Sequence, residues 1–155
     1  MKSSRRRARE FALQAIYQWL LNESSADTLL AQLREQKDFP KADQPLAEAL
    51  LRGVVGNAGA LRQLLTPYLD REIKGLSPVE HALLLLSAFE LRDHAQTPYK
   101  VVINEAIELA KSFGGTDGHK YVNGVLDKLA AELRSAEVKS NPTQRREDAK
   151  ETQHK

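Results

Sequence analysis

The chain has 155 residues, 41% of them hydrophobic and 28% charged, a composition that suits one domain with a single apolar core. It has no cysteine, which excludes disulfides and thiolate metal sites and favours a cytoplasmic protein over an extracellular one. No uninterrupted apolar stretch approaches the roughly 20 residues needed to span a bilayer, so we expect no membrane contact.

The net charge of +2 is distributed unevenly along the chain. Residues 1–10 carry +4 and residues 139–155 carry +2, which leaves −4 for residues 11–138. An acidic body therefore follows a basic segment. The cationic side chains of this basic segment are Lys2, Arg5, Arg6, Arg7 and Arg9.

Helical periodicity dominates the sequence. Apolar residues recur at a spacing near 3.6, and no alternating β-branched run is present, which predicts an all-α protein. The first expected helix starts near Ser3 or Ser4, either of which can cap it, and runs to about residue 22. The other expected helices cover about residues 27–36, 44–65, 78–94, 101–113 and 117–134. We expect residues 1–134 to form the domain, and residues 135–155, which have almost no apolar side chains, to form a disordered polar tail.

The first helix has one stripe that is expected to face the core. At about 100° per residue, this stripe consists of Ala8, Phe11, Ala12, Ala15, Ile16 and Trp19. Arg5 and Arg9 border the stripe and are expected at the solvent edge, whereas Arg6 and Arg7 project away from it. Because a helix dipole disfavours cations at the N-terminus by about 0.3–1 kcal/mol each, stability does not explain the basic segment.

A second apolar face of the same helix lies roughly opposite the first. It is formed by Leu13, Tyr17, Leu20 and Leu21. Two interpretations stay open: neighbouring helices bury this face, or it binds another protein. In the second case, two copies of the chain could also pair through it as a homodimer.

The fourth helix has the clearest start signal, the sequence SPVE. Ser77 is placed to cap the N-terminus, Pro78 suits the first helical position, and Glu80 can bond back to complete a capping box. Residues 79–94 are apolar on most faces, which predicts the central buried helix.

The start of the last helix is a candidate for phosphate binding. His119, Lys120 and Tyr121 follow a glycine-bearing turn, and the free N–H groups and positive dipole of a helix N-terminus favour phosphate. Tyr121 could stack on a base or pack, half buried, beside Val122. Asp117 could cap the helix, accept a base amino group or repel phosphates.

The basic segment also has two interpretations. It can serve only to keep the protein soluble, or it can bind a polyanion, because Arg side chains bind phosphates bidentately and arginine-rich segments often order on RNA. A nucleotide-binding P-loop is not indicated, since no GKS or GKT follows the glycine pair at 114–115.

The sequence resembles the NusB family of bacterial transcription antitermination factors in three separated stretches. These are RRRAREFALQAIYQ, PYKVVINEAIELAKSFG and HKYVNGVLDKLA. The resemblance covers residues 1 to about 134 and implies a compact helical bundle of two three-helix halves. It also implies a protein without cofactor that binds single-stranded boxA RNA with the ribosomal protein NusE. That pair joins the transcription elongation complex on ribosomal RNA operons.

The resemblance also assigns roles to individual residues. It implies RNA contacts by Lys2, Arg5, Arg6, Arg7, Arg9, Asp117, His119, Lys120 and Tyr121. It places Tyr17 and Glu80 at positions that face NusE, to which we add the apolar neighbours Leu13 and Leu21. The capping role of Glu80 and a partner contact can coexist, because the cap uses few of its lone pairs.

Catalysis is not expected. His81, His94, His119 and His154 show no metal-ligand spacing such as HExxH, and no serine lies in a nucleophile elbow. Two other functions remain alternatives. One is a protein-only helical adaptor that uses the Tyr17 face and needs none of the arginines, and the other is a NusB-like RNA-binding domain of an RNA-modification system.

Overall fold

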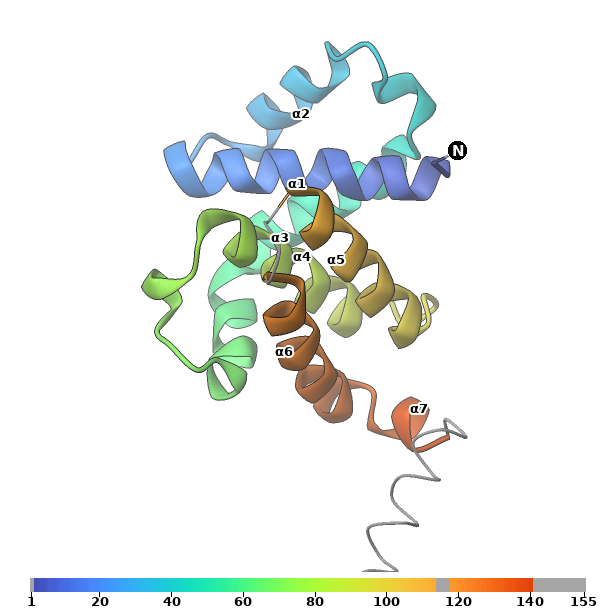
Figure 1. Cartoon of the computed structure of the whole chain (residues 1–155). Helices are drawn as coiled ribbons and strands as arrows, with labels where there is room; N and C mark the ends of the chain where they lie inside the picture. Colours follow the sequence, from blue (N-terminus) through green and yellow to red (C-terminus); the bar gives the residue numbers. More distant parts are fainter. Residues whose placement is uncertain (1, 114–117, 141–155) are drawn as a thin grey trace, which may run out of the picture.

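The computed structural model describes residues 2–113 and 118–140, and every regular element in these ranges is helical (Figure 1). The α-helices are α1 (Ser4–Asn22), α2 (Ala26–Arg34), α3 (Gln44–Leu65), α4 (Pro78–Asp93), α5 (Tyr99–Phe113), α6 (Gly118–Leu133) and α7 (Ser135–Ser140). Short 3-10 turns are η1 (Phe39–Lys41), η2 (Thr66–Tyr68) and η3 (Ile73–Gly75). The predicted all-α class is confirmed. None of the described helices is long and apolar enough to cross a membrane.

The predicted starts of two helices are confirmed by their capping contacts. The Ser3 hydroxyl accepts a hydrogen bond from the Arg6 amide at 3.1 Å, so that Ser3 rather than Ser4 caps α1. At α4, the Ser77 hydroxyl accepts from the Glu80 amide and the Glu80 carboxylate accepts from the Ser77 amide, each at 3.1 Å. These reciprocal bonds complete the predicted capping box.

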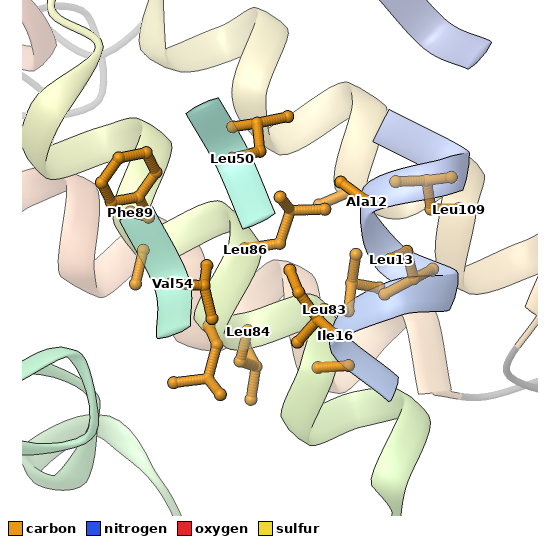
Figure 2. Packing of buried hydrophobic residues seen from close by; sticks show 14 of the residues in the cluster. Ala12, Leu13, Ile16, Leu50, Val54, Leu83, Leu84, Leu86, Phe89 and Leu109 are labelled. Atoms are coloured by element: carbon orange, nitrogen blue, oxygen red, sulfur yellow. The ribbon is translucent and has the colours of Figure 1, made fainter. Parts of the chain in front are cut away.

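Helix α4 is the central element of the bundle. Its residues from Ala82 to Leu91 are all buried, and it contacts α1, α3, α5 and α6. Figure 2 shows Leu83 and Leu86 of α4 among apolar side chains of the neighbouring helices, such as Ile16 and Leu50. Neighbours on every side explain why this helix is apolar on most faces, as predicted.

Helices α3 and α4 approach each other closely at Gly53. A Cβ atom at this position would lie 2.0 Å from Cζ of the Phe89 ring, so a larger residue fits only if the ring moves. Four residues later, the side-chain amide of Asn57 donates to the Gly53 carbonyl at 2.7 Å, and α3 kinks at Asn57. Gly53 is therefore a packing position, which helical periodicity alone does not reveal.

The disordered tail was predicted to begin too early. Residues Ser135–Ser140 form α7, and the rest of the tail lies outside the described residues. Arg134 is buried and donates to four backbone carbonyls within residues 90–97. Its guanidinium also lies 2.7 Å from the Glu137 carboxylate, which accepts from the Tyr99 amide at 2.7 Å. Polar contacts of this kind order a segment whose composition offers little apolar surface.

Candidate nucleic-acid and partner surfaces

The basic segment forms the start of α1, and the structure removes Arg9 from its exposed part. Arg9 is only 4% exposed, and its guanidinium donates to the Glu90 carboxylate of α4 at distances of 2.8, 2.9 and 3.2 Å. Burial lowers the pKa of Arg9, but the hydrogen bonds and the charge of Glu90 outweigh that effect and leave the pKa raised. The expectation that Arg9 lies at the solvent edge and contacts RNA is therefore corrected: it joins α1 to α4.

Two other cations of the basic segment are paired with carboxylates at the surface. Arg6 donates through Nε and Nη2 to the two oxygens of Glu105 on α5, each at 3.0 Å, and Lys2 lies 3.0 Å from Glu10. The hydrogen bonds and charge of Glu105 raise the pKa of Arg6. The side chains of Arg6 and Lys2 stay 38% and 54% exposed. Both therefore keep N–H donors for a further ligand.

Arg5 and Arg7 are the unpaired cations of the basic segment. Arg5 is exposed and Arg7 half-buried, and neither has an ion-pair partner within the part of the chain that the structure describes. Arg7 lines a polar surface depression of about 330 Å³ together with Lys2, Gln36 and Lys37, and with two carboxylates. The basic surface thus extends from α1 to the residues before η1, and Lys37 adds a cation that the sequence analysis did not select.

Tyr121 lies in the first turn of α6 and contacts the loop between η2 and η3. Its ring packs partly against the core, and its hydroxyl accepts a hydrogen bond from the Asp70 amide at 3.3 Å. The guanidinium carbon of Arg71 lies 4.3 Å from the centroid of the ring. Burial raises the pKa of the Tyr121 phenol. The ring is thus half-buried, as one interpretation predicted, and a cation covers it.

The neighbours of Tyr121 differ in their accessibility. Lys120 is exposed, whereas His119 is half-buried, and its Nδ1 has no hydrogen-bond partner within residues 2–113 and 118–140. Asp117 lies outside the described residues, so its three interpretations stay open. Different elements hold the two candidate RNA surfaces: α5 contacts the basic segment, and the loop between η2 and η3 contacts Tyr121.

A small apolar groove lies on the second face of α1. Leu13, Gln14 and Tyr17 of α1, Val79 of α4 and Phe113 of α5 line its volume of about 150 Å³. Tyr17 and Phe113 are 37% and 43% exposed, whereas Leu13 is 3% exposed. Each interpretation therefore describes one part of this face. Neighbouring helices bury Leu13, whereas the rings of Tyr17 and Phe113 remain accessible to another protein.

The other predicted partner residues lie close to the groove in sequence. Leu21 is 60% exposed, one helical turn beyond Tyr17 on α1. Glu80 follows the groove residue Val79 and is half-buried in its capping box. The pKa of Arg71 is raised mainly by its hydrogen bonds to Asp70, and the charge of Glu80 acts in the same direction. The first turn of α4 therefore contributes Val79 to the groove and Glu80 to the electrostatic surroundings of Arg71.

The histidine on α4 belongs to the packing of the bundle. His81 Nε2 accepts a hydrogen bond from Arg62 Nε at 3.1 Å, and the Arg62 guanidinium carbon lies 5.8 Å from the Trp19 ring centroid. Burial, and then the charge of Arg62, lowers the pKa of His81 to about 4. His81 is therefore neutral near pH 7. Among the described residues, no group of three or more His, Asp or Glu side chains could hold a metal ion.

Sequence reasoning missed three surface residues that the structure places beside the candidate sites. Phe113 carried no distinguishing signal, because at about 100° per residue it falls on the same face of α5 as Ala106 and Ala110, which indicates a core residue, although it is 43% exposed. Lys37 and Arg71 lie outside the α-helices, where periodicity does not indicate which way a side chain points.

A family model and individual relatives both show which known sequences this chain resembles. A sequence model of the NusB family matches residues 6–131. The transcription antitermination protein NusB of Burkholderia lata is 58% identical over 139 residues, which cover 90% of this chain and 96% of that protein. The protein of the same name from Bordetella pertussis is 56% identical over 145 residues, covering 91% and 94% of the two chains.

Solved structures show the same fold. A structure of T. maritima NusB is similar with a TM-score of 0.74 and 32% sequence identity, over 85% of this chain and 94% of that one. A structure of the antitermination factors NusB and NusE in complex with dsRNA is similar with a TM-score of 0.70. Its identity of 23%, over 85% of this chain and 99% of that one, supports the fold alone.

Proposed function

The chain belongs to the NusB family, and from this premise we propose that it is a non-enzymatic transcription antitermination factor that binds boxA RNA jointly with the ribosomal protein NusE. Its relatives in Burkholderia lata and Bordetella pertussis are named transcription antitermination proteins. In this proposal the pair joins the transcription elongation complex in the cytoplasm and promotes processive transcription of ribosomal RNA operons.

The placement of Arg5 and Arg7 carries the RNA-binding part of the proposal. Both lie in the first turn of α1, where the helix dipole disfavours cations, and neither has a compensating carboxylate among the described residues. A cation that costs stability and is not neutralised within the fold is available for an anion from outside. The planar guanidinium suits phosphate oxygens, to which it can donate two parallel hydrogen bonds.

The partly paired cations extend this surface. Lys2 and Arg6 keep exposed N–H donors beside their carboxylate partners, so phosphates can bind them without breaking the ion pairs. Lys120 on α6 offers a further exposed cation beside Tyr121. Proposed RNA contacts are therefore Lys2, Arg5, Arg6, Arg7 and Lys120, with Asp117, His119 and the half-buried Tyr121 kept as candidates and Arg9 left out.

The apolar groove supports the protein-partner part of the proposal. Tyr17 and Phe113 expose aromatic rings beside a concave apolar surface, and accessible aromatic side chains are enriched at protein interfaces. Leu21 lies one helical turn beyond Tyr17, and Glu80 follows the groove residue Val79 in the sequence. We assign the groove to NusE, and pairing of two copies of the chain through the same face would compete with that partner.

The groove also favours a second candidate function, a protein-only adaptor. Such an adaptor would use Tyr17 and Phe113 and would need none of the arginines. Equilibrium binding of the full chain to a boxA oligonucleotide and to a scrambled one, with and without NusE, separates the two functions. An adaptor binds NusE and shows no preference between the RNAs.

A further inference from the structure

The loop between η2 and η3 places a cation on the aromatic ring that was expected to stack on RNA. The Arg71 guanidinium carbon lies 4.3 Å from the centroid of the Tyr121 ring. This distance is within the range of a cation–π contact. The residues come from positions that are 50 apart in the sequence, so the contact is a product of the tertiary fold.

Asp70 holds both members of this contact. Its carboxylate accepts hydrogen bonds from Arg71 Nε at 2.6 Å and from Arg71 Nη2 at 3.2 Å. Its backbone amide donates to the Tyr121 hydroxyl at 3.3 Å. The guanidinium plane is therefore oriented before any ligand arrives. The side chain of Arg71 is still 42% exposed, and Nη1 has no hydrogen-bond partner among the described residues.

Tyr121 does not offer a free ring to a nucleobase. Its ring is half-buried and packs against the core, and Arg71 covers it from the loop. A base could stack directly on the phenol only after Arg71 had moved and its contacts with the ring had been lost. A guanidinium plane, however, is itself a surface on which bases stack in RNA complexes.

We propose that Arg71 is the outer layer of a base-stacking platform, in which an unpaired nucleobase of RNA stacks on the guanidinium and Tyr121 supports it from beneath. The inference rests on the proposed function, since it takes RNA as the ligand. Arg71 is the residue that touches the base, while Asp70 and Tyr121 position it. Nη1 of the partly exposed Arg71 side chain, and the exposed Lys120, which precedes Tyr121 in the sequence, are available to bind the phosphate that follows the base.

The test compares three variants of the full chain, Arg71→Ala, Arg71→Lys and Lys74→Ala, for binding to boxA and scrambled oligonucleotides. Lys74 is the matched control, because it is an exposed cation in the same segment that pairs with Glu72 and does not contact Tyr121. Arg71→Ala and Arg71→Lys should both weaken boxA binding by roughly five-fold or more, the loss of one stacked base. Arg71→Lys should keep the salt dependence of binding, and Lys74→Ala should bind as the wild type does.

Other outcomes overturn the inference. If Arg71→Lys binds boxA as tightly as the wild type, Arg71 supplies only charge. If Arg71→Ala binds more tightly, and photo-crosslinking of 5-iodouridine RNA to Tyr121 increases, Arg71 blocks the ring instead of forming the platform. A wild-type chain without preference for boxA contradicts the proposed function itself. A wild type that prefers boxA, with unchanged Arg71 variants, contradicts this inference alone.

Discussion

Arg9 on α1 and Glu90 on α4 form a bidentate ion pair inside the helical bundle, with N–O distances of 2.8–3.2 Å. Their side chains are 4% and 2% exposed. The pair joins the helix that carries the basic segment to the central helix of the fold. It therefore fixes the position of the start of α1, which carries the exposed Arg5 and the half-buried Arg7.

Arg9→Ala should destabilise the protein strongly, because it leaves the Glu90 carboxylate buried without a partner. We expect a loss of about 3–5 kcal/mol in the free energy of unfolding, measured by urea denaturation with Trp19 fluorescence and circular dichroism. Arg5→Ala is the matched control and should change stability by less than about 0.5 kcal/mol. A stable Arg9→Ala protein with impaired RNA binding would return Arg9 to the RNA contacts.

The double variant Arg5→Ala/Arg7→Ala should lose RNA affinity without losing stability. Each phosphate contact to a single strand contributes about −0.7 to the slope of log affinity against log salt, so removal of two contacts should flatten the slope by about 1.4. Titrations between about 50 and 200 mM salt measure this slope. Arg52→Ala controls for charge alone, because Arg52 is a surface cation of α3, outside the basic segment, that pairs with Asp27 of α2 and Glu48 of α3. An unchanged slope in the double variant would exclude Arg5 and Arg7 as phosphate contacts.

Phe113→Ala should weaken NusE binding, since it removes an accessible aromatic wall of the groove. A loss of about 1–2 kcal/mol, or roughly five- to thirty-fold in affinity, is expected for a central aromatic contact. Isothermal titration calorimetry with the isolated ribosomal protein measures it. Val101→Ala removes a 41% exposed apolar side chain elsewhere on α5 and should have no effect. If both variants bind NusE equally well, the partner occupies another face.

The stability of the protein should fall in mild acid because of His81. The pKa of His81 is about 4 in the folded protein, below its ordinary value of 6.5, so the unfolded chain takes up the proton first as the pH decreases. The contribution of His81 is therefore complete above pH 6.5 and is lost progressively down to about pH 4. A pKa lowered from 6.5 to about 4 corresponds to about 3.4 kcal/mol, and solvent screening of the half-buried ring reduces this to roughly 2 kcal/mol. Unfolding at several pH values should show a shallower pH dependence for His81→Gln than for the wild type. Identical pH dependence would show that His81 does not contribute.

The helix starts were predictable because their signals are local. Ser3, Ser77 and Glu80 are within three residues of the amides that they cap, so the sequence around each one contains the whole interaction. The buried run of α4 was predictable for the same reason, since ten consecutive buried residues, from Ala82 to Leu91, leave no polar face.

The role of Arg9 was not predictable from local pattern. A residue that borders the core stripe can face solvent or a neighbouring helix, and the outcome depends on Glu90, 81 residues away. Arg6 shows the same dependence, because its partner Glu105 is 99 residues away. Charge in a sequence segment thus indicates how many cations are present, while the tertiary fold decides which of them remain free for a ligand.

Neither the order of residues 135–140 nor the cover of the Tyr121 ring was predictable from the sequence. Composition predicted disorder from residue 135, but Glu137 has partners in Arg134 and in the Tyr99 amide, which lies 38 residues earlier. Tyr121 was identified as an aromatic residue near the start of α6. The sequence did not indicate that Arg71 covers its ring, because Arg71 lies in a loop, where no periodic pattern shows which way a side chain points. Both features depend on contacts between distant segments.

The proposed function requires that the chain recognises boxA RNA and does so more strongly with NusE. Fluorescence anisotropy of a labelled boxA oligonucleotide and of a scrambled one, at near-physiological salt and with or without NusE, tests it most directly. We expect tighter binding to boxA than to the scrambled RNA and a further gain in affinity when NusE is present. Equal and weak binding to both RNAs, unchanged by NusE, would contradict it.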